Sequence, residues 1–120
     1  MAIKAQPAVL VVEDEAILRF DAVDALTQSG MDVSEAANAA EALTILKARP
    51  DISIMFTDIN MAGHMDGLGL VREVKKRWPH IRIVVTSGQV KMRDADLPGG
   101  ARFIAKPYSI SHLQTVMGQA

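Results

Sequence analysis

The sequence predicts an α/β fold in which helices cover both faces of a parallel β-sheet. Short apolar runs rich in β-branched residues alternate along the chain with segments whose apolar residues recur at helical spacing. The runs at residues 9–12, 52–56 and 81–85 are almost wholly apolar, which is typical of strands buried on both faces. Right-handed crossovers between such strands require helices on both sides of the sheet.

The individual strands and helices follow from these patterns and from their stop signals. Five strands are predicted, over residues 9–12, 31–36, 52–58, 81–85 and 102–105. A first helix runs from Glu15 to Ser29 and stops at Gly30, which supplies a left-handed end. Asn38 and Glu41 have the spacing of a capping box and open a second helix, which Pro50 ends.

The second half of the chain yields two clear helices and one irregular segment. The third helix, which Pro79 closes, has an apolar inner face made of Leu70, Val71, Val74 and Trp78. The closing helix has an inner face made of Ile110, Leu113, Val116 and Met117. Residues 89–100 contain Pro98, Gly99 and Gly100, so we expect only a short or distorted helix there.

Length and composition limit the possible functions. The chain has 120 residues, 49% of them hydrophobic, so we expect a single domain over residues 1–120 with its core at about 8–118. Cysteine is absent, which excludes thiolate metal sites and cysteine nucleophiles. The net charge of −1 argues against direct binding of nucleic acid. No apolar run approaches the ~20 residues of a membrane span, so we expect a soluble, cytoplasmic protein with no membrane partner.

Several strands end on residues whose chemistry matches. Because the carboxyl ends of parallel strands share one edge, that edge should gather Glu13, Asp14, Asp58, Thr86 and Lys106. Each residue has a plainer interpretation when taken singly. Asp58 starts a loop, Glu13 and Asp14 are acids near a helix start, Thr86 caps a helix, and Lys106 is a surface lysine. The coincidence of matched groups at four strand ends favours a site.

Three neighbouring carboxylates would repel one another and raise each other's pKa values, a problem that a hard divalent cation removes. Mg²⁺ prefers oxygen ligands, retains water molecules and typically binds one or two carboxylates together with a phosphate. Lys106 adds a positive charge and Thr86 a hydroxyl donor. The combination predicts a phosphoryl-transfer site in which Asp58 is the carboxylate nucleophile.

The same motifs resemble those of the response-regulator receiver domains of two-component signalling. The resemblance rests on the motifs at residues 11–14, 57–61, 65–67, 85–88 and 106–107. It implies a flavodoxin-like, doubly wound, five-stranded parallel sheet of order 2-1-3-4-5 with five helices. The fourth of these helices is the short or distorted one.

The resemblance also implies a role for each site residue. Asp58 accepts a phosphoryl group from a histidine kinase or phosphotransfer protein and thereby switches a surface that binds an unidentified downstream protein. The Mg²⁺ site comprises Asp14 and Asp58 directly, Glu13 through water and the backbone carbonyl of Asn60. Lys106 binds the phosphoryl group, Thr86 and the aromatic Phe103 move when it arrives, and a core role for Phe103 remains open. Gly67 and Pro107, the latter after a cis peptide bond, are structural.

The chain departs from the family pattern in three places. Ala62 replaces a common proline, and Gly63 and His64 make the loop after the phosphoacceptor one residue longer. The segment at residues 89–100 is compressed, so the usual signalling face should be atypical. No output domain follows Ala120, so we expect either a stand-alone receiver or one cut from a larger regulator or hybrid kinase.

Two rival functions remain. A Mg²⁺-dependent phosphohydrolase that forms an aspartyl-phosphate would need a second acid two residues after Asp58, where Asn60 cannot serve. A degenerate receiver is disfavoured because all the expected site residues are present. We therefore expect a phosphoacceptor regulator with Mg²⁺-dependent self-phosphorylation and self-dephosphorylation, not an enzyme. His64, His80 and His112 lack metal-ligand spacing and are predicted to be surface residues, and Met61 and Met65 to be loop anchors.

Overall fold

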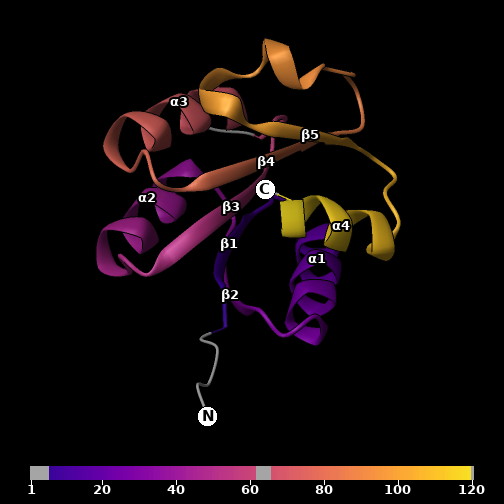
Figure 1. The fold of residues 1–120 in the computed structure, drawn as a ribbon, viewed down its shortest axis with the longest axis horizontal. Helices are drawn as coiled ribbons and strands as arrows, with labels where there is room; N and C mark the ends of the chain where they lie inside the picture. The colour runs from indigo at the N-terminus through magenta and orange to yellow at the C-terminus, as the bar shows by residue number, and fades with distance from the viewer. Residues whose placement is uncertain (1–5, 62–65, 120) are drawn as a thin grey trace.

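The computed structural model describes residues 6–61 and 66–119. The strands are β1 (Ala8–Val12), β2 (Asp32–Ala36), β3 (Ile52–Asp58), β4 (Arg82–Ser87) and β5 (Arg102–Ala105). The α-helices are α1 (Ala16–Gln28), α2 (Ala39–Ala48), α3 (Gly67–Arg77) and α4 (Ile110–Gln119). Two 3₁₀ turns, η1 (Asp94–Asp96) and η2 (Pro98–Gly100), lie between β4 and β5. All strand pairs are parallel and the order is β2-β1-β3-β4-β5, as predicted (Figure 1).

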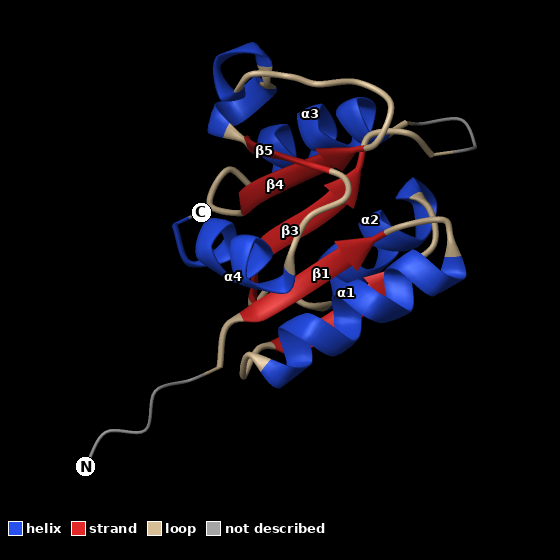
Figure 2. Ribbon diagram, turned by 90° about the vertical axis from the view of Figure 1, so that its right-hand side faces the viewer, coloured by secondary structure: helices blue, strands red, loops and turns tan. Residues whose placement is uncertain are grey.

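The helices cover the two faces of the sheet in pairs. Figure 2 shows α1 and α4 in front of the sheet and α2 and α3 behind it. Alternate residues of β1 serve the two faces: Leu10 packs with α2 and α3, whereas Val9 and Val11 pack with α1 and α4. Both faces of the central strands are therefore buried, which explains their uniformly apolar sequences.

The predicted helix boundary signals are present in the structure. The Asn38 Oδ1 accepts a hydrogen bond from the backbone N–H of Glu41 at 2.9 Å, and Glu41 Oε1 accepts one from the N–H of Ala37 at 2.9 Å. This reciprocal arrangement satisfies two donors that would otherwise lack partners at the start of α2. Gly30 follows α1 with φ of 88°, a left-handed conformation that favours glycine.

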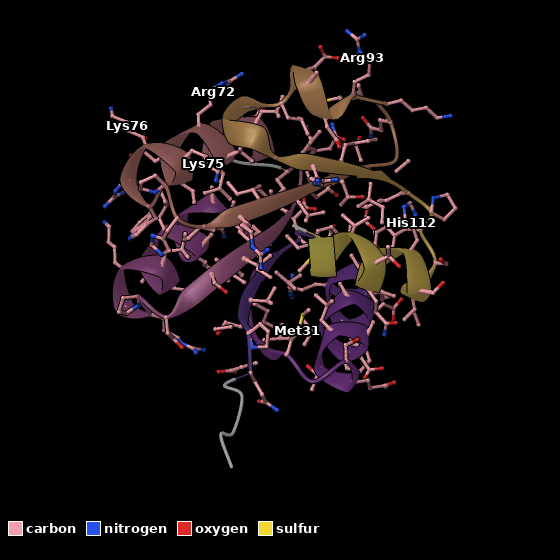
Figure 3. All side chains as sticks on the ribbon, viewed as in Figure 1. Met31, Arg72, Lys75, Lys76, Arg93 and His112 are labelled. Carbon is pink, nitrogen blue, oxygen red and sulfur yellow. The ribbon has the colours of Figure 1, made fainter. Side chains whose placement is uncertain are left out.

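The segment between β4 and β5 contains the two 3₁₀ turns where the fold pattern called for a fourth α-helix. The described residues therefore form four α-helices instead of five, and the predicted distortion of this segment is confirmed. Leu97 anchors the segment in the core, and Asp94 Oδ1 accepts a hydrogen bond from the N–H of Phe103 at 2.8 Å. Gly99 lies against the Lys75 side chain with φ of 65°. In Figure 3, Arg93 projects outward from this segment.

One predicted core position is wrong, and two histidines lie where we expected them. Ile110 is 59% exposed, because it is the first residue of α4 and lies at the rim of the space between α1 and α4. His80 and His112 are exposed and Met61 is buried, as predicted. The predictions for His64, Met65 and the longer loop fall on residues 62–65, outside the described residues. Within the described ranges, no helix has the length and apolar character needed to cross a membrane.

Gly67, the first residue of α3, lies directly against the end of β3. A Cβ at this position would overlap the backbone carbonyl of Asp58 and lie 2.5 Å from the Cα of Ile59. Both neighbours are backbone atoms, so neither can move aside cheaply. Gly67 therefore permits the close approach between the start of α3 and the end of β3.

We expect Gly67→Ala to lower the free energy of unfolding by about 2 kcal/mol or more, because the added methyl group must displace the end of β3. Urea denaturation monitored by circular dichroism measures this loss. Gly118→Ala on α4 is the matched control, since a Cβ there meets nothing within 4 Å. Helix propensity should make the control neutral or more stable by about 0.5–1 kcal/mol. Equal stabilities of Gly67→Ala and the wild type would contradict the steric argument.

Candidate phosphoacceptor site

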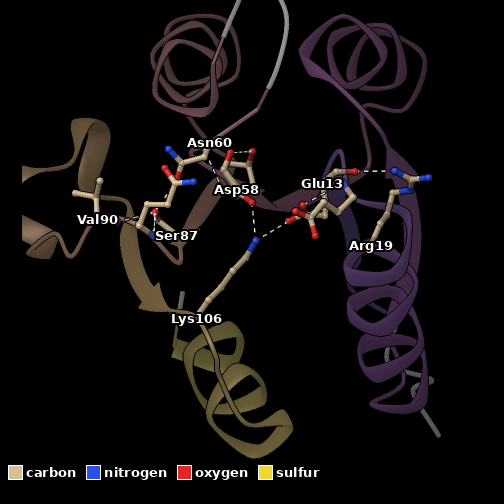
Figure 4. Close-up of polar contacts among 10 residues, drawn as sticks. Glu13, Arg19, Asp58, Asn60, Ser87, Val90 and Lys106 are labelled. Carbon is tan, nitrogen blue, oxygen red and sulfur yellow. Dashed lines mark hydrogen bonds and ion pairs between the residues drawn. The ribbon is translucent and has the colours of Figure 1, made fainter.

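Four parallel strands deliver the predicted site residues to one edge of the sheet. Asp58 is the last residue of β3 and lies in register with Thr86 on β4. Glu13 and Asp14 follow β1, and Lys106 follows β5. Figure 4 shows Glu13, Asp58, Asn60 and Lys106 converging from separate elements. Because these side chains come together, a shared site explains them better than separate roles as a loop start, helix-start acids, a helix cap and a surface lysine.

The three carboxylates form one acidic cluster. Glu13, Asp14 and Asp58 each offer a carboxylate oxygen, and these oxygens all lie within 4.8 Å of one another. Glu13 and Asp58 are each only 5% exposed, whereas Asp14 is exposed. Buried like charges this close together destabilise the ionised state unless a cation compensates them.

Lys106 supplies part of that compensation. Its Nζ donates to Asp58 Oδ2 at 2.6 Å and to Glu13 Oε2 at 3.1 Å. Burial lowers the pKa of this ammonium, but hydrogen bonds to Asp58 and Glu13 outweigh the burial and raise the pKa above its ordinary value. Lys106 therefore remains charged at neutral pH. The peptide bond between Lys106 and Pro107 is cis, as predicted.

Glu13 is harder to ionise in this cluster than an ordinary glutamate is. Burial raises the pKa of its carboxyl from 4.5 to about 7, and repulsion from Asp58 adds to the increase. The N–H of Glu15, which donates to Glu13 Oε1 at 3.2 Å, and Lys106 act in the opposite direction. Arg19 Nη1 donates to the backbone carbonyl of Glu13 at 2.7 Å and so fixes the chain where β1 passes into α1.

Asp58 is held through both carboxylate oxygens. Its Oδ1 accepts a hydrogen bond from the backbone N–H of Asn60 at 2.8 Å, and its Oδ2 accepts one from Lys106. The Asn60 side chain is fixed separately, because Ser87 Oγ donates to its Oδ1 at 2.7 Å. Sequence reasoning included Ser87 in a motif but assigned it no role. The only available signal was a polar residue at the end of a buried strand.

Thr86 and Phe103 lie close to the site in different environments. Thr86 is 2% exposed, and its Oγ1 has no hydrogen-bond partner among the residues that the structure describes. A buried hydroxyl without a partner is unusual, and a polar ligand bound beside it would give it one. Phe103 is half-buried and packs against the core cluster beneath α2 and α3. Its movement during switching stays a prediction.

The residues at this edge fit a hard divalent cation. The donor set is entirely oxygen, includes three carboxylates and lies at an edge where Asp14 is exposed. One ammonium faces three carboxylates here, so Lys106 alone does not neutralise the cluster. In the described part of the chain, this is the group of acidic and histidine residues that has metal-ligand geometry.

Comparisons with known proteins agree with this geometry. The family model of the response regulator receiver domain matches residues 9–117. The chemotaxis protein CheY of Thermotoga maritima is 37% identical over 110 residues, which cover 88% of this chain and 89% of CheY. A response regulator receiver protein from Sinorhizobium medicae has a similar structure, with a TM-score of 0.85, 29% identity and coverage of 95% of this chain and 93% of that one. The chain therefore belongs to the response regulator receiver domain family.

Other relatives are much longer than this chain. Sensor kinase CckA of Brucella abortus is 38% identical over 113 residues, which cover 91% of this chain but 12% of CckA. The putative NtrX-like response regulator of Rickettsia bellii is 33% identical over 116 residues, which cover 93% of this chain and 24% of the relative. Receiver domains of this kind thus occur both alone and within larger signalling proteins.

The strain on Glu13 leads to a pH-dependent prediction. In the folded chain Glu13 holds a proton that the unfolded chain has released, so this group makes stability fall as pH rises from about 4.5 to about 7. Glu13→Gln removes the group. In EDTA the variant should exceed the wild type by about 3 kcal/mol near pH 8, and by only about 0.5 kcal/mol near pH 4.5.

Urea denaturation at the two pH values measures the difference between wild type and variant. Glu73→Gln, on the surface of α3 where Glu73 faces Arg77 at 3.8 Å, controls for the loss of a carboxylate as such. A stability gap between wild type and Glu13→Gln that is the same at both pH values would show that Glu13 is not the strained group.

Proposed function

We propose that this chain is the phosphoacceptor of a two-component system, in which Asp58 takes a phosphoryl group from a histidine kinase or phosphotransfer protein. The observation that carries the proposal is the position of Asp58, at a strand end beside two further carboxylates and hydrogen-bonded to Lys106. The unpartnered Thr86 hydroxyl supports the same proposal, since a phosphoryl oxygen would give it a partner. Phosphorylation then changes a surface that a downstream protein recognises.

Mg²⁺ is the proposed cofactor, held by Asp14 and Asp58 with Glu13 and the Asn60 backbone carbonyl completing the site. When bound, it neutralises the carboxylates and the charge of the phosphoryl oxygens. The protein's own contribution is orientation. Lys106 and the N–H of Asn60 each fix one oxygen of Asp58, so the carboxylate presents a defined geometry to the donor.

The proposed chemical step is an in-line displacement at phosphorus. A carboxylate oxygen of Asp58 forms a new O–P bond while the N–P bond of the donor phosphohistidine breaks, and the imidazole nitrogen keeps the electron pair. Lys106 changes partner from the carboxylate to the phosphoryl oxygens, which keeps a positive charge beside the anion. Water later hydrolyses the acyl phosphate, which releases inorganic phosphate and regenerates Asp58, so the chain is a switch with Mg²⁺-dependent self-phosphorylation and self-dephosphorylation and not a turnover enzyme.

The phosphodonor is proposed to dock on α1 and the start of α4. A groove of about 620 Å³ lies between these helices and includes Lys106 and Pro107 in its lining, so it reaches the site. Ile17 and Phe20 on α1 are 77% and 69% exposed, an arrangement that favours contact with another protein. The exposed Asp21 and Asp24 lie on the same helix face and favour a partner with basic residues. CckA, one of the relatives, is a sensor kinase.

We expect acetyl phosphate and Mg²⁺ to phosphorylate the wild type stoichiometrically and to leave Asp58→Ala unlabelled, because the substitution removes the nucleophile. Intact-protein mass spectrometry at neutral pH detects the added phosphoryl group. Asp66→Ala, at the N-cap of α3, is a matched control that loses another aspartate of the same segment. Steady turnover of a generic phosphate ester with Mg²⁺ would instead favour the hydrolase alternative.

We expect Phe20→Ser to lower the rate of phosphoryl transfer from a phosphorylated histidine kinase or phosphotransfer protein about tenfold or more, because an exposed aromatic anchor is lost. The rate with acetyl phosphate, which needs no docking surface, should not change. Val90→Ser removes another exposed apolar side chain, 49% exposed, from the segment after β4 and serves as the control. A tenfold loss with acetyl phosphate as well would place the effect of Phe20 in folding and not in docking.

A further inference from the structure

Ser87, the last residue of β4, joins three segments around the site. Its side chain is buried, and its Oγ donates to Asn60 Oδ1 at 2.7 Å. The same Oγ accepts hydrogen bonds from the backbone N–H groups of Gln89 and Val90, each at 3.1 Å. Its backbone carbonyl accepts a hydrogen bond from the N–H of Lys106 at 3.0 Å. One residue thus connects the loops that follow β3, β4 and β5. Figure 4 shows Ser87 between Asn60 and Val90.

The neighbouring Thr86 is in the opposite situation. Both residues are 2% exposed, yet the Ser87 hydroxyl makes three hydrogen bonds, whereas the Thr86 hydroxyl makes none with the described residues. An unpartnered buried hydroxyl favours any arrangement that would give it a partner. Because the two residues are adjacent in the chain, a backbone movement that brings Thr86 toward an anion on Asp58 would also displace Ser87. The hydrogen bonds of Ser87 oppose that movement.

The Asn60 end of this connection is also sensitive to the state of Asp58. The backbone N–H of Asn60 donates to Asp58 Oδ1 at 2.8 Å, while its side chain is held by Ser87. A phosphoryl group on Asp58 changes the charge and the acceptor geometry at the first of these contacts. A series of hydrogen bonds runs from Asp58 through Asn60 to Ser87 and Val90. Phosphorylation of Asp58 would therefore affect this series at Asn60 and, through Thr86, at Ser87.

We propose that the Ser87 hydroxyl is a positioning group that holds Asn60 and the backbone after β4 in the arrangement of the unphosphorylated chain, and that it releases them when an anion binds at Asp58. The inference rests on the proposed phosphoacceptor function. It assigns Ser87 a measurable effect on the balance between the two states. A Ser87 that merely caps the turn after β4 would affect stability alone.

The test measures the affinity for trifluoroberyllate, a tetrahedral analogue of the phosphoryl group, in the presence of Mg²⁺ by titration calorimetry. Ser87→Ala should bind it about fivefold more tightly than the wild type, which corresponds to ~1 kcal/mol of restraint removed. Asn60→Ala removes one of the three hydrogen bonds from an exposed residue and should tighten binding by a smaller factor. In the Ser87→Ala background, Asn60→Ala should add nothing, because its effect passes through Ser87.

A second measurement needs neither the metal nor the anion. In EDTA, the amides of Gln89 and Val90 should exchange with deuterium faster in Ser87→Ala than in the wild type, because they lose their acceptor. Ser29→Ala is the matched control. Its hydroxyl also joins two segments, donating to the Ala25 carbonyl at 2.9 Å and accepting from Gln114 Nε2 at 2.6 Å. The control should change neither the exchange of Gln89 and Val90 nor the affinity for trifluoroberyllate.

The outcomes separate the two proposals. If the wild type binds trifluoroberyllate and Ser87→Ala binds it with an affinity within about twofold or more weakly, the role of Ser87 is overturned and the phosphoacceptor function stands. If the wild type fails to bind, the proposed function fails and the inference falls with it. Should Ser87→Ala not fold, Asn60→Ala decides, since its side chain is at the surface: unchanged or weaker binding overturns the proposal and tighter binding supports it.

Discussion

The ammonium of Lys106 between two buried carboxylates is the interaction on which this site depends. Glu13 follows β1 and Asp58 ends β3, each is only 5% exposed, and both accept a hydrogen bond from this ammonium. The compensation is incomplete, because one ammonium faces the three carboxylates of Glu13, Asp14 and Asp58. A site that is left short of positive charge favours a further cation, and this residual deficit is the physical basis for proposing Mg²⁺. The strand ends that bring the carboxylates and Lys106 together thus also determine the charge that a bound cation would have to balance.

Much of this arrangement could be predicted from the sequence, because the relevant signals are local. Apolar runs identify the buried strands, and the residue after each run marks the shared carboxyl edge, so Glu13, Asp14, Asp58, Thr86 and Lys106 could be grouped before any coordinates were known. The three carboxylates and Lys106 do converge. Helix caps such as Asn38 were predictable for the same reason, since their partners lie within a few residues.

The features that escaped prediction depend on contacts between distant segments. Periodicity placed Ile110 on an inner face, but whether the first turn of α4 is covered depends on where α1 ends in space. The contact of Ser87 with Asn60 spans 27 residues of sequence and leaves no periodic signal. The path taken by residues 88–101 depends on how Leu97 and Gly99 pack against the core and Lys75. Local composition indicated only that a regular helix would not form there.

The shortened segment after β4 changes how a signal can leave the site. In a receiver with a full helix at this position, movement at the end of β4 would pass to a rigid element several turns long. Here residues 94–96 and 98–100 form only single 3₁₀ turns, fixed mainly by Leu97 in the core and by the Asp94 contact with β5. Short turns carry little cooperative rigidity, so a displacement at Ser87 would alter the nearby surface around Val90 more than distant parts of the segment. The backbone hydrogen bond from the N–H of Lys106 to the carbonyl of Ser87 connects that surface to the groove between α1 and α4. The proposed docking groove and the surface around Val90 that is proposed to respond therefore meet at the residues that surround Asp58, and no long helix is required between them.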